Sequence, residues 1–144
     1  MDEQPGTAVL MFIAHRDAES RVMAALARSG ADDLTIAQSR LLQRLDPAGM
    51  RLTDLAEQAG VTKQTAGALV DQLERAGYVS RQPDPTDARA RLVTLSDRGM
   101  TVCRRAGVEV AEVEKEWRKH LGGRRFDAMR AALLALRDIT DPYR

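Results

Sequence analysis

Apolar residues recur every three or four positions in the first and last parts of the chain, which is the spacing of one face of a helix. From about residue 7 to 29 the pattern predicts one long helix, which Gly30 ends. The last part carries two further apolar seams, separated by Gly122-Gly123, and predicts two more helices. The seams are Val9, Phe12, Ile13, Val22, Met23 and Leu26; Val102, Ala106, Val110, Val113, Trp117 and Leu121; and Phe126, Met129, Leu133, Leu136 and Thr140.

Helix start and stop signals follow the first predicted helix. Thr35 and Gln38 have the spacing of a capping box, in which the side chain of each residue satisfies the backbone N–H of the other. Asp46-Pro47 would end the helix that they start, because proline disfavours helical geometry in the residue before it. We therefore expect a short second helix at about 35–45.

The middle of the chain has the spacing of a helix-turn-helix. Thr53 can cap a helix of about seven residues, Gly60 offers the left-handed position at its end, and Thr62 can cap the next helix. The two faces of that next helix differ: one carries Ala66, Leu69, Val70, Leu73 and Gly77, and the other Gln64, Ala68, Asp71 and Arg75. We expect the first face to pack inward and the second to face solvent.

After Gly77 the pattern changes to two short apolar runs, "YVSRQ" and "RLVTL", with eight residues rich in Pro and Asp between them. Such runs predict a β-hairpin, and its tip is expected to be too long for a tight two-residue turn. A helix-turn-helix followed at once by a hairpin is the order of a winged helix. The expected fold class is therefore mainly α with a small β-hairpin wing (α+β), with further helices at both ends of the chain.

Length and composition narrow the possible classes of protein. The 144 residues fit one domain, and 22 basic against 21 acidic residues leave a net charge of +1, so the bulk charge does not attract nucleic acid or an anionic membrane. Aromatic residues total 3%, too few for a base-stacking platform. No apolar stretch approaches the roughly 20 residues needed to cross a bilayer, and the first apolar run follows acidic rather than basic residues. We expect a soluble cytoplasmic protein without a membrane partner.

The second helix of the helix-turn-helix has suitable residues for reading DNA at its N-terminal end. Lys63, Gln64 and Thr65 lie at unpaired backbone amides, where the helix dipole favours a phosphate. Gln64 can also pair with an adenine edge, and Ala68 is small enough to let the helix approach a major groove. These residues predict a recognition helix.

Two other residues of this helix give opposing evidence about DNA binding. Gly67 costs about 1 kcal/mol relative to alanine in mid-helix, and close approach to a groove is one reason for accepting that cost. Asp71 would repel phosphates unless it accepts a hydrogen bond from a cytosine amino group. An ordinary surface helix with a polar face therefore remains the alternative.

The charged residues of the hairpin have different expected roles. An exposed loop bearing Arg89 can reach a minor groove, where the negative potential deepens as the groove narrows. Asp87 can hold Arg89 in position through a charge-assisted hydrogen bond, and Arg91 is expected to contact a phosphate. Asp84 is expected to be a solvated loop charge without a role. A surface ion pair worth about 0 to 1 kcal/mol remains the alternative for Asp87 and Arg89.

The apolar seams of the first helix and of the C-terminal helices exceed what a small winged core can cover. We expect them to bury each other across a two-fold axis. Such a dimer would place two recognition helices about one duplex turn apart. Packing of the same helices within a monomer is the alternative.

The sequence gives little support for catalysis. His15 and His120 lie on separate predicted helices, and the chain has no G-x-S-x-G, phosphate-loop or metal-ligand pattern. Cys103 lies next to an apolar seam, followed by Arg104 and Arg105, and is expected to be a buried small hydrophobe rather than a redox sensor. We expect no enzyme activity, no catalytic residue, no metal and no cofactor.

The run "LTDLAEQAGVTKQTAGALVDQLERAGYVSRQPDPTDARARLVTLSDRG" resembles the MarR family, the multiple antibiotic resistance type of winged-helix regulators. The likeness is strongest in "LVDQLERAGYVSRQPDPTDAR" and in the "LVTLSDRG" that leads into a long helix, and helix order extends it over nearly the whole chain. It implies a homodimer with intertwined terminal helices that binds a pseudo-palindromic operator and usually represses genes. The implied domain is 1–144, with 33–97 as winged helix-turn-helix and 7–30 and 98–140 as dimerisation helices.

The resemblance also implies which residues touch DNA. The helix matching Thr62 to Gly77 enters the major groove, the arginine matching Arg89 enters the minor groove, and the aspartate matching Asp87 orients that arginine. Together with the residues placed by their chemistry, the expected DNA-binding set is Thr53, Thr62, Lys63, Gln64, Thr65, Ala68, Arg75, Asp87, Arg89 and Arg91.

Many family members release DNA when a small aromatic or phenolic ligand binds between the dimer helices and the winged part. Others sense oxidants through a cysteine near the start of the first helix, where this chain has none. An arginine or histidine in such a crevice would suit a carboxylate or phenolate, and the expected ligand-binding residues are Phe12, His15, Arg16 and Arg40. A winged-helix protein-interaction module without specific DNA binding remains the alternative function, because the net charge is small and Asp71 lies on the reading face.

Overall fold

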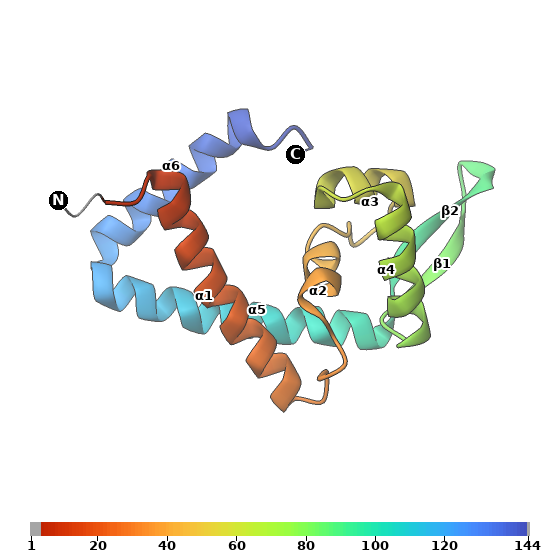
Figure 1. The fold of residues 1–144 in the computed structure, drawn as a ribbon, viewed down its shortest axis with the longest axis horizontal. Helices are drawn as coiled ribbons and strands as arrows, with labels where there is room; N and C mark the ends of the chain where they lie inside the picture. The colour runs from red at the N-terminus through yellow and green to blue at the C-terminus, as the bar shows by residue number, and fades with distance from the viewer. Residues whose placement is uncertain (1–3, 144) are drawn as a thin grey trace. The chain divides into compact units, whose positions relative to one another are not determined.

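The computed structural model describes residues 4–143, which form six helices and two strands (Figure 1). In chain order they are α1 (Thr7–Arg28), α2 (Ile36–Leu42), α3 (Leu52–Ala59), α4 (Lys63–Arg75), β1 (Val79–Asp84), β2 (Asp87–Leu95), α5 (Asp97–Leu121) and α6 (Gly123–Thr140). A helix-turn-helix is followed directly by a hairpin. The predicted fold class, mainly α with a small β-hairpin wing, is confirmed.

The described residues divide into two compact units. One runs from Met23 to Ala106 and holds α2, α3, α4 and the hairpin; we call it the winged-helix unit. The other combines the chain up to Val22 with the chain from Gly107 onward, and we call it the helical unit. It holds the larger part of α1, the second half of α5 and all of α6.

The apolar face of α4 forms the centre of the winged-helix unit. Ala66 and Val70 are 0% exposed and Leu73 is 1% exposed. Complete burial of a valine or leucine side chain contributes roughly 1.5–3 kcal/mol to stability. The opposite face is solvent-exposed through Gln64, Ala68, Asp71 and Arg75. The outward face is confirmed, and the inward face is confirmed for Ala66, Val70 and Leu73. Leu69 is only half-buried, and the prediction for Gly77 is wrong, because the helix ends at Arg75 and Gly77 is exposed beyond it.

Most of the predicted helix signals act as expected. The residues that start or end helices as predicted are Thr35 with Gln38, Gly60 and Thr62. The second helix, however, ends at Leu42 rather than near residue 45. The reason is a tightening of its last turn, where the amides of Arg44 and Leu45 donate to carbonyls three residues back, at 3.1 and 3.2 Å.

Thr53 does not cap α3, so that prediction is wrong. The N-cap is Arg51, whose side chain makes no capping hydrogen bond, and the helix begins at Leu52. Backbone pairing with β2 explains the earlier start. The N–H of Met50 donates to the Val93 carbonyl at 3.1 Å, and the Met50 carbonyl accepts from Val93 at 2.8 Å. Because this bridge holds the chain extended at Met50, the helix starts directly after it and Arg51 lies beside the hairpin.

The hairpin is tighter than the sequence predicted. Strands β1 and β2 pair antiparallel along their length, out to Asp84 opposite Asp87, with a register shift just before Asp84. Only Pro85 and Thr86 lie between the strands, so the prediction of a long tip is wrong. The Asp84 carboxylate accepts from the backbone N–H of Thr86 at 2.8 Å and from its hydroxyl at 2.7 Å, which closes the turn. The prolines fit because a two-stranded ribbon has free edges.

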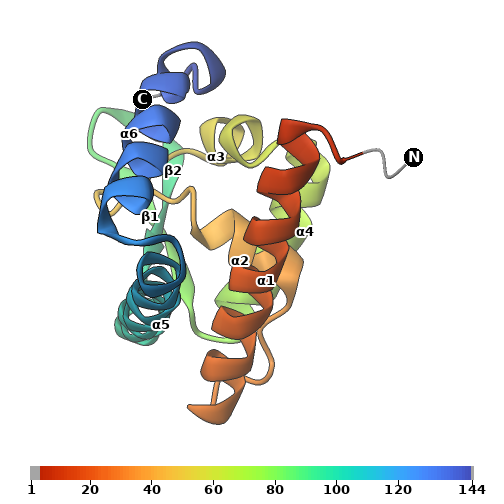
Figure 2. The ribbon, with the colours of Figure 1, turned by 90° about the vertical axis from the view of Figure 1, so that its left-hand side faces the viewer.

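In the helical unit, α5 and α6 meet at Gly122, where the chain changes direction (Figure 2). Gly122 has a φ of 84°, a value that favours glycine. Beyond it, Phe126 is 4% exposed and lies under the guanidinium of Arg118, with 4.7 Å between the Arg118 Cζ and the ring centroid. This cation–π contact and the burial of Phe126 hold the corner. No helix within residues 4–143 is long and apolar enough to cross a membrane.

Candidate nucleic-acid interface

The N-terminal end of α4 exposes polar side chains on a capped helix. The hydroxyl of Thr62 accepts from the backbone N–H of Thr65 at 3.0 Å and lies 3.0 Å from the Thr65 hydroxyl. Lys63 and Gln64 are exposed beside this cap. Because the first backbone amides of a helix carry partial positive charge, this end suits a phosphate or the acceptors of a base edge. Because the Thr62 hydroxyl is engaged in the helix cap, Lys63 and Gln64 are better placed than Thr62 to donate hydrogen bonds to a ligand.

An arginine neutralises the acidic residues on the exposed side of α4. Arg81, on β1, places its Nη2 2.7 Å from Oδ1 of Asp71 and its Nη1 3.1 Å from Oε1 of Glu74. The repulsion that Asp71 would exert on a phosphate backbone is thereby reduced. The same pairing ties α4 to the wing strand β1. Asp71, which favoured an ordinary surface helix, is thus compatible with a recognition helix.

Gly67 is not required by packing within the protein. A Cβ built at this position would meet only the Cδ2 of Leu52, at 3.6 Å, which is an ordinary contact. The internal structure would therefore accept an alanine. An approach of α4 to an external partner remains a reason for the glycine.

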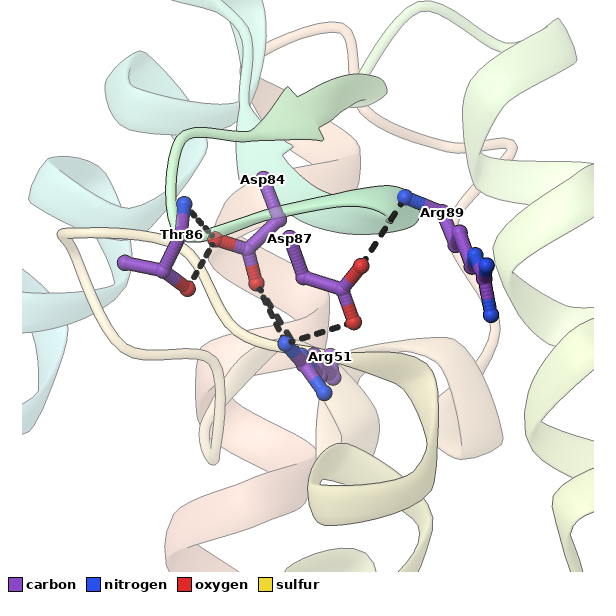
Figure 3. Close-up of polar contacts among 5 residues, drawn as sticks. All are labelled: Arg51, Asp84, Thr86, Asp87 and Arg89. Atoms are coloured by element: carbon purple, nitrogen blue, oxygen red, sulfur yellow. Dashed lines mark hydrogen bonds and ion pairs between the residues drawn. The ribbon is translucent and has the colours of Figure 1, made fainter.

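The wing tip contains a cluster of charged residues that the sequence did not predict, and Asp84 is its most buried member (Figure 3). Asp84 is 7% exposed, and its Oδ2 lies 3.0 Å from Nε and 2.9 Å from Nη2 of Arg51. Hydrogen bonds from Thr86, and then the pairing with Arg51, lower the pKa of the Asp84 carboxyl. The prediction that Asp84 is a solvated loop charge without a role is wrong. We call Arg51, Asp84, Thr86 and Asp87 the Arg51 cluster.

Asp87 contacts Arg89 through the backbone. Its Oδ1 accepts from the Arg89 backbone N–H at 3.0 Å, and its Oδ2 lies 3.7 Å from Nη2 of Arg51. The side chain of Arg89 extends away from the cluster (Figure 3). It is exposed, and no ion pair of its guanidinium is found within residues 4–143. Asp87 therefore fixes the backbone from which Arg89 projects and leaves the Arg89 guanidinium available.

Arg91, Thr53 and Arg75 complete the expected DNA-binding set, and all three are exposed. Arg91 follows Arg89 on β2, Thr53 lies in the first turn of α3, and Arg75 is the last residue of α4. All belong to the winged-helix unit. Their roles toward DNA remain predictions.

Sequence reasoning missed Arg51, and only part of its cluster had a signal. Asp84 and Thr86 have the spacing of an aspartate that accepts from the backbone two residues on, which is a known turn pattern. Arg51 is separated from Asp84 by 33 residues. Nothing in the local sequence indicates that pairing.

A second cluster supports the base of the wing. Tyr78 is 0% exposed, and its hydroxyl donates to Oδ1 of Asp33 at 2.5 Å. Arg98 stacks on the Tyr78 ring, with 4.2 Å between its Cζ and the ring centroid, and its Nη2 lies 3.5 Å from the same carboxylate oxygen. Burial, and then the hydrogen bond to Asp33, raises the pKa of Tyr78 to about 12. The hydrogen bond from Tyr78 lowers the pKa of Asp33. The start of the hairpin is thus tied to two distant segments.

The expected ligand-binding residues lie on two helices. Phe12, His15 and Arg16 are exposed on α1, where the Arg16 Cζ lies 6.0 Å from the centroid of the Phe12 ring. Nε2 of His15 lies 3.5 Å from Oε2 of Glu19, one helical turn away. Arg40 is exposed on α2. Binding of a ligand by these residues remains a prediction.

Cys103 is partly buried on α5, and burial raises the pKa of its thiol. A raised thiol pKa reduces the thiolate fraction and therefore the reactivity toward oxidants. This supports the interpretation of Cys103 as a packing residue. The described part of the chain has no group of three or more His, Cys, Asp or Glu side chains that could hold a metal ion.

Comparison with known proteins identifies the family. A model described as "MarR family" matches residues 32–90. YcgE of Bacillus subtilis, named as an uncharacterized HTH-type transcriptional regulator, is 32% identical over 109 residues, which cover 65% of this chain and 68% of YcgE. The transcriptional activatory protein BadR of Rhodopseudomonas palustris is 41% identical over 54 residues, or 38% of this chain. That match spans only 31% of the length of BadR.

Solved structures match nearly the whole chain. The transcriptional repressor CouR, bound to a 23-mer DNA duplex, is 26% identical and has a TM-score of 0.69, covering 91% of this chain and 92% of CouR. The Mycobacterium tuberculosis MarR family protein RV2887, in complex with salicylic acid, is 25% identical with a TM-score of 0.68, covering 94% of this chain and 99% of that protein. The family model matches the helix-turn-helix and the wing up to residue 90, YcgE is similar over most of its length, and these structures share the fold. The chain therefore belongs to the MarR family.

Proposed function

We propose that the protein is a transcriptional regulator that binds double-stranded DNA sequence-specifically as a homodimer on a pseudo-palindromic operator. In this proposal α4 enters the major groove, where Lys63 and Gln64 contact phosphate and base edges. Arg89 enters the adjacent minor groove from the wing.

One observation carries the proposal. The exposed N-terminal end of α4 and the exposed side chain of Arg89 belong to the same winged-helix unit. The carboxylates near them are paired by Arg81 and Arg51. Two donor-rich surfaces on one unit, with their neighbouring negative charges neutralised, suit a duplex better than they suit a small solute. The similarity to CouR, solved on a DNA duplex, supports the same interpretation.

The homodimer is supported by exposed apolar side chains in the helical unit. In α1, five consecutive residues are 38 to 54% exposed, from Val9 to Ile13. In α6, Leu134 is 54% and Ile139 is 85% exposed. Exposed apolar surface of this kind marks an interaction site, and a two-fold partner would bury the same residues twice.

We further propose that the regulator represses transcription and is released by a small phenolic or aromatic ligand. RV2887 was solved with salicylic acid, which supports this class of ligand. Phe12, His15, Arg16 and Arg40 supply an aromatic ring and basic groups for a carboxylate or phenolate. BadR is named as an activatory protein, so reporter expression is the measurement that assigns the direction of regulation.

Footprinting on the DNA that flanks the protein's own gene tests this proposal. We expect two protected half-sites about one duplex turn apart, and a loss of protection as salt rises from about 50 to 200 mM, because phosphate binding releases counterions. Salicylate added at fixed salt should reduce the protection. Protection that salicylate leaves unchanged would contradict the ligand class but not DNA binding.

A protein-interaction module is the second candidate function. The net charge of only +1 favours it, because nonspecific attraction to DNA would be weak. Absence of protection on genomic fragments at every salt concentration between about 50 and 200 mM would favour this function over the first.

A further inference from the structure

We propose that Arg51 is a positioning residue that fixes the wing to the helix-turn-helix, so that Arg89 meets the minor groove at a set distance from α4. This inference rests on the proposed function, since it concerns how the same interface binds DNA. Arg51 acts through the residues that it contacts and does not itself touch DNA.

Arg51 occupies the point where the helix-turn-helix and the wing meet. It is the N-cap of α3, directly after the residue whose backbone pairs with Val93 of β2. From there its guanidinium reaches the wing tip and places two nitrogens within 3.0 Å of Oδ2 of Asp84. Its Nη2 also lies 3.7 Å from Oδ2 of Asp87. One side chain thus bridges the start of α3 and both strand ends at the tip (Figure 3).

Each aspartate that pairs with Arg51 also accepts a hydrogen bond from the backbone of the wing. Asp84 uses its second oxygen to accept from Thr86 in the turn. Asp87 uses its second oxygen to accept from the backbone N–H of Arg89. A continuous path of polar contacts therefore runs from α3, through Arg51 and Asp87, to the residue that projects from the wing.

The physical need for such a path follows from the wing itself. A two-stranded ribbon has little stability of its own and bends readily. The side chain of Asp84 is only 6% exposed, and a buried carboxylate that loses its cationic partner is strongly destabilised. Without Arg51 the tip would move to rehydrate Asp84, and the Arg89 backbone would move with it. Asp84 and Asp87 would also become unpaired negative charges near the DNA phosphates.

The experiment compares two operators that share the core half-sites but differ in the flanks under the wing. One has A·T flanks, whose narrow minor groove attracts arginine, and the other has G·C flanks. The affinity ratio between the two measures how well Arg89 is presented. The variants are Arg51→Ala, Arg51→Lys and, as a charge-matched control, Arg104→Ala on α5, whose side chain contacts Thr101 one turn away.

We expect the unaltered protein and Arg104→Ala to prefer the A·T flanks to the same extent. Arg51→Ala should lose at least tenfold in affinity for the A·T operator and little for the G·C operator, so that the ratio approaches one. Arg51→Lys should be intermediate, because it keeps the charge but not the second donor to Asp84. If Arg51→Ala does not fold, judged by circular dichroism, Arg51→Lys carries the test.

A double variant separates positioning from direct contact. In an Arg89→Ala background, Arg51→Ala should change affinity less than twofold, because the residue it positions is already absent. An undiminished loss in that background would mean that Arg51 contacts phosphate itself, and would overturn the proposal. Equal losses on both operators, or unchanged affinity of Arg51→Ala, would overturn it as well. If the unaltered protein binds neither operator, the proposed function fails first.

Discussion

Helix α4 and the wing tip both carry acidic residues that an arginine neutralises, but the pairings span different lengths of chain. Arg81 pairs with Asp71 and Glu74, which are ten and seven residues away. Arg51 pairs with Asp84 across 33 residues. The pairing that neutralises the acidic residues of α4 is therefore local in sequence, whereas the pairing at the wing tip exists only after the fold has formed.

This difference has an energetic consequence. Substitutions in α4 that keep its buried face and the hydrogen bond between Gln72 and Gln38 should have small effects on stability. Substitutions where distant segments meet at the hairpin should lower the free energy of unfolding by more, because they displace the backbone or leave a buried polar group unpaired.

The largest effect is expected at Gly99, where the start of α5 packs against the base of the hairpin. A Cβ at this position would lie 2.1 Å from the Tyr78 carbonyl oxygen and 3.0 Å from the Cδ2 of Leu95. Because the carbonyl belongs to the backbone, it cannot move without displacing β1. We expect Gly99→Ala to lower the free energy of unfolding by about 3 kcal/mol, measured by urea denaturation.

Gly107→Ala is the matched control for this prediction. Gly107 lies on the same helix, and no atom lies within 4 Å of a Cβ built there. Since alanine is the better helix former, this variant should gain up to about 1 kcal/mol. Similar losses in both variants would mean that helix α5, rather than its packing on the hairpin, is sensitive to substitution.

The same contrast explains what the sequence could predict. The cap at Thr62 and the buried positions Ala66 and Val70 are visible because their signals lie within a few residues of each other. The hairpin is visible from its two apolar runs. The tip was wrongly predicted to be long because the local spacing of Asp84 and Thr86, whose hydrogen bonds close the turn, was not recognised. The burial of Asp84 against Arg51 was missed because no local pattern connects the two residues.

The error at Thr53 has a similar origin. Thr53 is a good capping residue by type, and its own surroundings do not reveal that the helix starts earlier. The contact that sets the start of the helix is the backbone pairing of Met50 with Val93, which lies 43 residues later in the chain. Only the Asp84 and Thr86 spacing offered a local signal that the turn would be tight.

The second prediction concerns Tyr78, which joins the hairpin to Asp33 across 45 residues. Its pKa is raised from 10.0 to about 12, so the folded state holds the phenol proton more tightly than the unfolded state. The contribution of this raised pKa to the free energy of unfolding is fully present below pH 10 and is lost as the pH rises toward 12. We expect the free energy of unfolding to fall by up to about 1.4 kcal/mol per pH unit in this window.

Tyr78→Phe isolates this contribution. The variant should be less stable at neutral pH, because Asp33 loses its hydrogen bond, and its stability should fall less steeply between pH 10 and 12. The measurement is urea denaturation at a series of pH values. An equally steep fall in the variant would assign the pH dependence to other groups.

The third prediction tests the function of the wing against that of the helix. Arg89→Ala should weaken operator binding at least tenfold, equal to about 1.4 kcal/mol, and should leave the circular dichroism spectrum unchanged, because its side chain projects from the protein (Figure 3). The measurement is a gel-shift titration at fixed salt, with Arg104→Ala as the charge-matched control. If Arg89→Ala binds with unchanged affinity, the wing does not contribute to DNA binding through Arg89, and α4 alone forms the interface.

The smallest effect on stability is expected at Gly67 of α4, and here two readouts should move in opposite directions. A Cβ at Gly67 would make only an ordinary contact with Leu52, so Gly67→Ala should raise the free energy of unfolding by up to about 1 kcal/mol. If the glycine allows α4 to approach the groove, the same variant should bind the operator more weakly. We expect this combination of higher stability and lower affinity, measured by urea denaturation and gel shift on one preparation. A variant that is more stable and binds equally well would show that α4 does not need the glycine to approach DNA.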